Sequence, residues 1–335
     1  MDSHAALEVV GVGNAIVDVI AAADDAFLAE HGMHKGSMAL VDEMRAQAIY
    51  AAMGPAVVTS GGSAANTIAG IASFGGRTGF IGKVRDDALG TEFRHDITAV
   101  GARFSTAPST TGPATACCLI LVTPDSQRTM NTFLGASAYL SAADLDEAMI
   151  RGAALTYLEG YLYDAPSAQH AFHIAAEIAH EAGRKVAFSL SDPFCVERHR
   201  AELLQLVDQH VDILFANQAE IASLFETNDF NIAVARVRTL TDIAALTRGP
   251  DGSVIVTHDA VVEIAAERVN SVVDTTGAGD LYAAGFLFGL THGVPLRGCG
   301  RLGSLAAAEV IGHFGARPQT NLRTLVEAAH LFGSA

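Results

Sequence analysis

The stretch Asp274-Thr275-Thr276-Gly277-Ala278-Gly279-Asp280 runs directly into an apolar segment with a helical period, residues 281–290. Small residues before a helix leave backbone N–H groups uncovered, and the helix dipole adds partial positive charge there. The segment therefore predicts an anion-binding site at the start of the helix. A tight glycine turn followed by an aspartate that stabilises the first helical turn explains the same pattern, so both interpretations stand at this point. One carboxylate beside three small residues favours phosphoryl transfer, which needs a base for the acceptor hydroxyl and donors for the developing charge.

Apolar runs of strand length alternate with helical periods along most of the chain. The expected strands are residues 8–12, 78–82, 155–158, 185–190, 213–216, 244–247 and 254–257, and the expected helices are residues 63–74, 166–182, 219–225 and 278–290. This alternation is typical of stacked βαβ units and predicts a doubly wound, mostly parallel α/β sheet flanked by helices. Such a sheet binds its ligands beyond the carboxyl ends of its strands.

Two segments, residues 34–41 and 102–133, interrupt the alternation. They combine short strand-like runs with turn residues such as Gly36, Pro113 and Pro124, and they contain no helix of the usual length. We expect them to form a small β-rich lid inserted into a single α/β domain that covers residues 1–335. No linker, charge block or internal repeat in the sequence marks a second domain.

The composition excludes several classes of protein. Of the 335 residues, 50% are hydrophobic and 17% are charged, which excludes wholesale disorder. The longest apolar stretches fall short of the roughly 18 to 20 residues of a membrane-spanning helix. The net charge of −16 argues against a nucleic-acid partner, because the surface repels phosphate backbones. The four cysteines, which form no CxxC pair, and the absence of a signal-peptide pattern in residues 1–8 predict a cytoplasmic location.

The sequence contains none of three familiar phosphate-binding patterns. Gly11 and Gly13 follow an expected strand, but the third glycine of GxGxxG would fall at Ile16. A Walker A loop around Gly82-Lys83 would need glycine at Arg77 and serine or threonine at Val84. The HRD and DFG segments of protein kinases are also missing. A nucleotide site in this chain must therefore have another design.

Three segments together resemble the signature of the PfkB-type (ribokinase) family of carbohydrate and nucleoside kinases. They are DTTGAGD at residues 274–280, Gly61-Gly62-Ser63-Ala-Ala-Asn66 and Asn217-Gln-Ala-Glu220. The opening Gly13-Asn14-Ala-Ile-Val-Asp18 and the segment at residues 127–138 are most similar to adenosine kinases. The resemblance spans residues 8 to about 320 in the family's order. It implies a ribokinase-like fold and ATP-dependent phosphorylation of the 5′-hydroxyl of adenosine.

Two alternatives accompany this expectation. Within the family, the acceptor could be a sugar, as for ribokinase-like or fructokinase-like enzymes. Outside it, the chain could be a nucleoside-binding protein without turnover, although the intact Asp280 and its glycine loop argue against that class.

The resemblance also implies roles for the matching residues around the acceptor. Asp280 matches the catalytic base, and Arg128 matches an arginine that reaches the phosphates when the lid closes. Asp18, just past the first expected strand, matches the carboxylate that binds two ribose hydroxyls. The remaining matches are the amides of Gly277, Ala278 and Gly279, which stabilise the transferring phosphoryl group, and the acceptor-pocket residues Asn14, Gly62, Ser63 and Asn66.

On the ATP side, the matching residues are Asn217, Thr247, Gly249 and Gly252. Asn217 and Glu220 are expected to organise Mg²⁺ through water molecules. ATP and Mg²⁺ are thus the expected cofactors, with a monovalent cation such as K⁺ as a further one. The resemblance leaves both a monomer and a homodimer open.

Each of these residues also has an ordinary structural interpretation. Asp18 could be a loop carboxylate, Arg128 an exposed turn residue, and Asn217 with Glu220 a helix cap with its capping-box acid. The chain also departs from the adenosine-kinase pattern. After Glu159-Gly160 it has Tyr161-Leu162-Tyr163 where those kinases carry aromatics that stack on the base, so the stacking residue stays open.

One further cluster has metal-ligand spacing. His170, His173, Glu177 and His180 share one face of an expected helix. Because Phe172 and several alanines occupy the opposite face and would pack inward, we expect the histidine face to be solvated.

Overall fold

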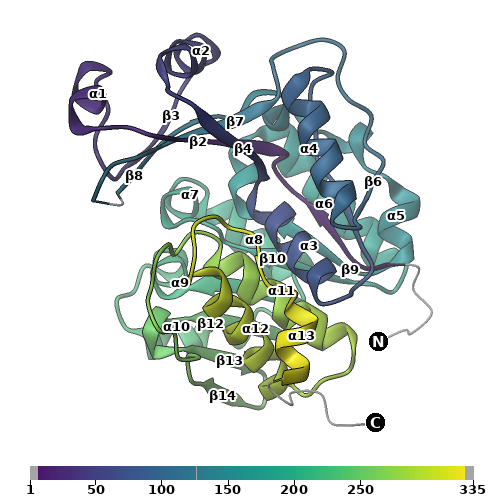
Figure 1. Cartoon of the computed structure of the whole chain (residues 1–335). Coiled ribbons are helices and arrows are strands. Elements are labelled where there is room, and N and C mark those ends of the chain that lie inside the picture. The colour runs from purple at the N-terminus through teal and green to yellow at the C-terminus, as the bar shows by residue number, and fades with distance from the viewer. Residues whose placement is uncertain (1–6, 126, 329–335) are drawn as a thin grey trace.

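The computed structural model describes residues 7–125 and 127–328, which form two β-sheets flanked by helices (Figure 1). The large sheet has nine strands in the spatial order β14 (Val261–Ile264), β13 (Ser253–Thr257), β12 (Ile243–Thr247), β11 (Ile213–Asn217), β10 (Lys185–Ser189), β9 (Ala153–Glu159), β1 (Leu7–Val12), β5 (Thr78–Ile81) and β6 (Arg103–Phe104). All neighbours from β12 to β6 are parallel, and β13 and β14 pair antiparallel at one edge. The predicted mostly parallel sheet is confirmed.

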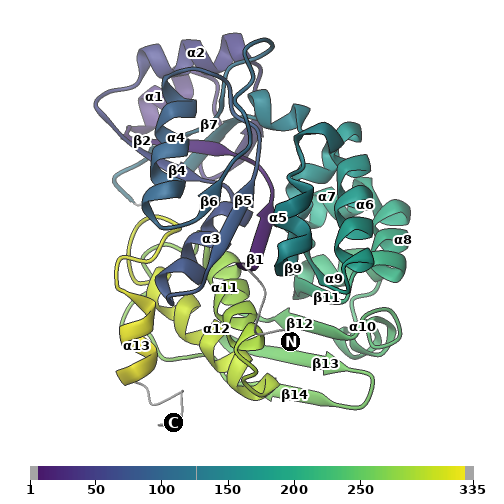
Figure 2. The same cartoon turned by 90° about the vertical axis from the view of Figure 1, so that its right-hand side faces the viewer.

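Helices cover both faces of the large sheet (Figure 2). One face packs against α3 (Ser63–Ser73), α4 (Ala88–Ala99), α11 (Ala278–Thr291), α12 (Leu296–Val310) and α13 (Leu322–Ala328). The other packs against α5 (Glu147–Gly152), α6 (Pro166–Glu181), α7 (Pro193–Arg198), α8 (Arg200–His210), α9 (Gln218–Phe225) and α10 (Phe230–Val237). Val9 and Val10 of β1 are both fully buried, but in different core clusters, because successive strand residues point to opposite faces. The sheet is therefore doubly wound, as expected.

The small sheet has five strands in the order β3 (Met38–Leu40), β8 (Arg128–Phe133), β7 (Ala116–Val122), β2 (Ile16–Ala22) and β4 (Ala56–Gly61). In Figure 1 it extends to the upper left, with α1 (Asp25–Glu30) and α2 (Glu43–Ala52) at its far end.

The small sheet is larger than the two segments expected to form it. Residues 34–41 and 102–133 supply β3, β7 and β8, whereas β2 and β4 lie outside these segments and β6 belongs to the large sheet. Asp18, expected just past the first strand, lies inside β2. The reason is the short connection of three residues after β1, through which the chain passes directly from the large sheet into the small one.

The four expected helices are confirmed within one residue at each end, and the seven expected strands within two. Short 3₁₀ helices connect the elements: η1 (Gly135–Tyr139), η2 (Ala142–Asp144), η3 (Gly160–Asp164) and η4 (Gly249–Asp251). Within the described ranges, no helix has the length and apolar composition needed to cross a membrane.

Candidate active site

Polar side chains gather at the carboxyl ends of the parallel strands, where a doubly wound sheet binds ligands. Asn14 follows β1, Glu159 ends β9, and Asn217 and Thr247 end β11 and β12. The register of β11 and β12 places Asn217 directly beside Thr247. The residues expected on the acceptor side and on the ATP side therefore share one edge of the large sheet.

Asp280 lies in the first turn of α11 and is held by the neighbouring helix α3. Ser63 Oγ donates to its Oδ1 at 2.6 Å, and Asn66 Nδ2 donates to its Oδ2 at 3.0 Å. Burial raises the pKa of Asp280, and these two hydrogen bonds oppose the rise by stabilising the carboxylate. The structure thus brings together three residues that the sequence placed in one site.

The backbone before α11 leaves hydrogen-bond donors free. Gly277 occupies the N-cap position with φ of 81°, a left-handed conformation that favours glycine, and no side chain caps the helix. The amide of Ala278 donates to the Thr275 carbonyl at 3.2 Å, but the amides of Gly277 and Gly279 have no acceptor among the described residues. A side chain at Gly279 would meet no atom within 4 Å. This helix start can therefore accept an anion.

Asp18 faces the start of α3 from the small sheet. Its carboxylate lies directly against Gly61. A Cβ atom at that glycine would come within 2.5 to 2.8 Å of the Asp18 carboxyl atoms. Gly62 has φ of 95°, and a Cβ there would collide with the carbonyl oxygen of Asn14. Burial raises the pKa of Asp18 to about 6, while the charges of Arg317 and Arg128 oppose this rise.

Glu159, which sequence reasoning did not assign to the site, ties the acceptor pocket together. Its side chain is 1% exposed and accepts hydrogen bonds from Asn14 Nδ2 at 2.6 Å and from the Ala64 amide at 2.8 Å. Asn14 in turn accepts from Ser137 Oγ at 2.8 Å. Burial raises the pKa of Glu159 to about 7. The carboxyl group thus supplies the missing cap for the first turn of α3.

Arg128 connects the small sheet to the segment that leads into α11. Its Nη1 lies 2.9 Å from Asp274 Oδ2 and 3.2 Å from Thr276 Oγ1. The Arg128 side chain is only 11% exposed, so its interpretation as an ordinary exposed residue is wrong. Asp274 also accepts from the amides of Thr276 and Gly315, at 3.1 and 3.0 Å. The arginine thus reaches the loop that carries the open amides.

Arg317 is a second cation that the sequence did not indicate. It lies between α12 and α13, in a segment without a recognised motif. Its Nε donates to Asn66 Oδ1 over 3.4 Å, and its Nη2 is buried without a hydrogen-bond partner among the described residues. Burial lowers the pKa of Arg317, and the charges of Asp96 and Asp18 oppose this. Among the described residues, Arg317 therefore joins Arg128, the arginine expected to reach the phosphates, as a second cation close to Asp18.

Asn217 and Glu220 form a reciprocal capping box at the start of α9. Asn217 Oδ1 accepts from the amides of Ala219 and Glu220, both at 2.9 Å, and Glu220 Oε2 accepts from the Asn217 amide at 2.8 Å. Burial raises the pKa of Glu220 to about 7, and the charges of Asp192 and Asp280 add to the rise. The alternative interpretation of this pair, a helix cap with its capping-box acid, is confirmed.

The same geometry limits how this pair can serve a metal. Both Asn217 and Glu220 are already engaged in the cap, yet each carboxylate oxygen of Glu220 keeps a further lone pair. Within the described ranges, no group of three or more His, Cys, Asp or Glu side chains could hold a metal ion directly. The residues therefore fit Mg²⁺ held through water molecules, since this ion keeps much of its hydration shell.

The aromatic segment after β9 divides between core and surface. Leu162 and Tyr163 are 2% and 1% exposed, whereas Tyr161 is 40% exposed. Of these three side chains, Tyr161 is the accessible one.

The histidine face of α6 is a polar surface without metal-site geometry. The ring of His173 packs edge-on against His210 of α8, and His180 Nε2 lies 3.0 Å from Asp212 Oδ2. No metal-binding group includes these side chains in the part of the chain that the structure describes.

Comparisons with known proteins agree with this geometry. The profile described as pfkB family carbohydrate kinase matches residues 44–322. An adenosine kinase structure from Sinorhizobium meliloti is 49% identical, covers 96% of this chain and 99% of its own, and superposes with a TM-score of 0.90. A probable sugar kinase from Rhizobium etli CFN 42 is 45% identical, covers 98% and 100%, and has a TM-score of 0.92. The adenosine kinase of Schizosaccharomyces pombe is 26% identical over 84% of this chain and 88% of its own. The fold is ribokinase-like, and the chain belongs to the pfkB family of carbohydrate kinases.

Proposed function

We propose that the protein is an ATP-dependent kinase that phosphorylates the 5′-hydroxyl of adenosine. The observation that carries this proposal is the Asp280 carboxylate, held by Ser63 and Asn66 beside the free amides of Gly277 and Gly279. This arrangement combines a base for a hydroxyl with donors for a phosphoryl group, which are the two requirements of phosphoryl transfer.

In the proposed mechanism, Asp18 accepts hydrogen bonds from the ribose diol while Asn14 and Asn66 line the acceptor pocket. The hydroxymethyl group then faces Asp280, which removes its proton during in-line attack. The amides of Gly277 and Gly279, together with Arg128, stabilise the charge on the transferring group. The small sheet acts as a lid that excludes water from the reaction.

On the donor side, Thr247, Gly249 and Gly252 would bind ATP with Asn217. Gly249 fits this role because a side chain there would meet no atom within 4 Å, which leaves the backbone open to a ligand. Asn217 and Glu220 would hold Mg²⁺ through water. When bound, this ion supplies positive charge that neutralises the phosphate oxygens.

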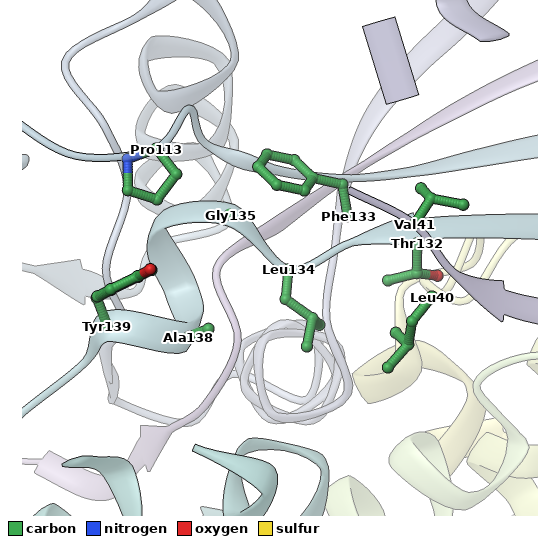
Figure 3. Close-up of a pocket in the computed structure, with 9 residues that line it drawn as sticks. All are labelled: Leu40, Val41, Pro113, Thr132, Phe133, Leu134, Gly135, Ala138 and Tyr139. Carbon is green, nitrogen blue, oxygen red and sulfur yellow. The ribbon is translucent and has the colours of Figure 1, made fainter. Parts of the chain in front are cut away.

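An apolar pocket beside η1, the 3₁₀ helix that contacts Asn14, favours a nucleoside over a free sugar. It has a volume of about 210 Å³ and is lined by residues of β3, β8 and η1 and of adjoining loop segments, including Leu40, Leu134 and Tyr139 (Figure 3). The same 3₁₀ helix carries Ser137, whose hydroxyl donates to Asn14. Apolar and aromatic walls suit the faces of a heteroaromatic base, whereas a sugar would leave them uncovered.

A sugar kinase is the second candidate, favoured by the 45% identity to the probable sugar kinase of Rhizobium etli. A panel of adenosine, inosine, guanosine, cytidine, ribose and fructose, assayed by ADP release, separates the two. We expect adenosine to have the highest kcat/KM. A higher value for ribose or fructose would favour the sugar kinase, and binding of adenosine without ADP release would favour a nucleoside-binding protein.

A further inference from the structure

We propose that Arg317 is a positioning residue of the acceptor site, which orients Asn66 toward Asp280 and supplies the fixed positive charge next to Asp18. The inference rests on the proposed function, since it concerns the site in which an acceptor hydroxyl would be activated. Arg317 lies outside the segments that carry the family resemblance.

The first contact is with Asn66, which lies between two opposite charges. Its Oδ1 accepts from Arg317 Nε over 3.4 Å, and its Nδ2 donates to Asp280 Oδ2 over 3.0 Å. An amide reversed end for end would turn its NH₂ group toward the guanidinium and its oxygen toward the carboxylate, which is repulsive on both sides. Arg317 therefore fixes the amide in the orientation that donates to Asp280.

The second contribution is electrostatic. The charge of Asp280 adds to the cost of ionising Asp18 in the buried site, and an opposite charge nearby favours the ionised form. Arg317 is the stronger of the two arginines that act on Asp18 in this way, ahead of Arg128. The charged or titratable groups that face Asp18 are Arg317 from the segment after α12, Arg128 from β8, Asp280 from α11, and Cys117 and Cys118 from β7.

The segment that carries Arg317 is anchored on the large-sheet side. The amides of Gln319 and Thr320 donate to Glu309 Oε1 of α12 at 3.0 and 2.7 Å, and the Leu322 amide donates to Ser73 Oγ of α3 at 3.0 Å. Arg128 instead belongs to the small sheet. Movement of the small sheet would therefore carry Arg128 and Asp18 together but leave Arg317 in place, so Arg317 is the charge that stays with Asn66 and Asp280 and that Asp18 meets when the small sheet lies over the site.

One guanidinium nitrogen of Arg317 indicates that this residue does more than stabilise the fold. Arg317 Nη2 is buried and has no hydrogen-bond partner among the described residues. A buried donor without a partner destabilises the folded protein, so the stability of the fold does not explain why an arginine occupies position 317. A charge required by Asp18 and Asn66 provides one.

The test compares Arg317→Met, which removes charge and donor, with Arg317→Lys, which keeps the charge. Arg323→Met is the matched control, since Arg323 is 69% exposed on α13 and pairs only with Glu327 among the described residues. Adenosine phosphorylation is measured from pH 5 to 9. In Arg317→Met we expect kcat to fall about 10- to 100-fold, as for a misplaced catalytic group. The acidic limb of kcat/KM should move to higher pH by about one unit. Arg317→Lys should keep the position of the acidic limb, and Arg323→Met should match the unmodified protein.

A second readout needs no substrate. The carboxyl ¹³C resonance of Asp18, assigned with Asp18→Asn, gives the pKa of Asp18 by titration. This pKa should rise in Arg317→Met and not in Arg317→Lys.

If adenosine is phosphorylated but Arg317→Met keeps the original kcat and pH profile, the inference is overturned and the proposed function stands. If Arg317→Met does not fold, Arg317→Gln takes its place with the same expected loss and shift, and a shifted limb in Arg317→Lys overturns the inference in either case. If no acceptor is phosphorylated while the Asp18 titration shifts as expected, the proposed function fails and the electrostatic role of Arg317 holds.

Discussion

Nη1 of Arg128 lies 2.9 Å from Oδ2 of Asp274, and the two side chains are only 11% and 5% exposed. This buried ion pair links β8 of the small sheet to the segment that leads into α11. A buried pair contributes little net stability against an apolar replacement of both partners, but loss of one partner leaves an unpaired buried charge. The contact thus couples the position of the small sheet to the loop with the free amides.

The stability losses from replacing each member of this pair should not add up when both are replaced. Arg128→Met leaves Asp274 unpaired and should lower the free energy of unfolding by about 3 to 5 kcal/mol. In the double variant Arg128→Met with Asp274→Asn, the loss should be smaller than the sum of the single losses. Urea denaturation measures all three. Lys35→Met, which breaks the surface ion pairs of Lys35 with Asp25 and Asp125 in the same part of the chain, serves as the control and should leave stability and turnover nearly unchanged. Strictly additive losses would show that the pair is not coupled.

Asp280→Asn tests the proposed base. An amide of nearly the same size cannot remove the hydroxyl proton, so kcat should fall by roughly 10² to 10⁴ while the fold and ATP affinity are kept. ADP release measures turnover, and calorimetry measures ATP binding. Asp259→Asn, at an exposed position between β13 and β14, should behave like the unmodified protein. Near-normal turnover in Asp280→Asn would remove Asp280 from the mechanism.

The parts of the site that sequence reasoning predicted are those determined by local structure. The open amides before α11 and the capping box of Asn217 and Glu220 each arise within a few residues at a helix start. Their physical basis, free donors and a small-residue turn, is visible in the order of the residues themselves. The parallel strands other than β6 could likewise be predicted, because each is a separate apolar run, whereas the two residues of β6 were expected in the small sheet.

The parts that were missed depend on contacts between distant segments. Glu159 meets Asn14 across 145 positions of sequence, and Arg317 meets Asn66 across 251. Neither residue lies in a pattern that indicates a partner, so tertiary packing alone brings them to the site. The extent of the small sheet was missed for a related reason, since β2 follows β1 too closely to be distinguished as a strand of another sheet.

Asp18→Ala tests the acceptor pocket. Loss of the carboxylate should weaken adenosine binding by about 1.5 to 3 kcal/mol, as for hydrogen bonds to a charged group, with ATP affinity unchanged. Since the pKa of Asp18 is raised to about 6, adenosine affinity in the unmodified protein should fall as the pH drops below about 6, and the variant should lose this dependence. Calorimetry at pH 5.5 and 8 checks both, with the exposed Asp86→Ala as control. If the variant discriminates against deoxyribose analogues as strongly as the unmodified protein, Asp18 does not bind the diol.

Glu159→Gln tests whether the carboxyl group that joins Asn14 to α3 carries a proton in the native state. The pKa of Glu159 is raised from its usual 4.5 to about 7. Between about pH 4.5 and 7, Glu159 keeps a proton in the native protein that it has released in the unfolded chain. The contribution of Glu159 to the free energy of unfolding is therefore full below about pH 4.5 and falls as the pH rises toward 7.

Glutamine cannot ionise and lacks this dependence, but its NH₂ group would replace one of the two carboxylate oxygens and face a donor there, either Asn14 Nδ2 or the Ala64 amide, which should destabilise the variant by about 1 to 3 kcal/mol at low pH. The difference in unfolding free energy between the two proteins should then shrink as the pH is raised from 5 to 8, because the unmodified protein loses the contribution of the protonated group. Urea denaturation at both pH values measures this difference. Glu30→Gln, an exposed change in α1, should follow the unmodified protein throughout. A difference that stays constant from pH 5 to 8 would mean that Glu159 binds no extra proton in the native state, and its hydrogen bonds to Asn14 and Ala64 would then be those of a permanently ionised carboxylate.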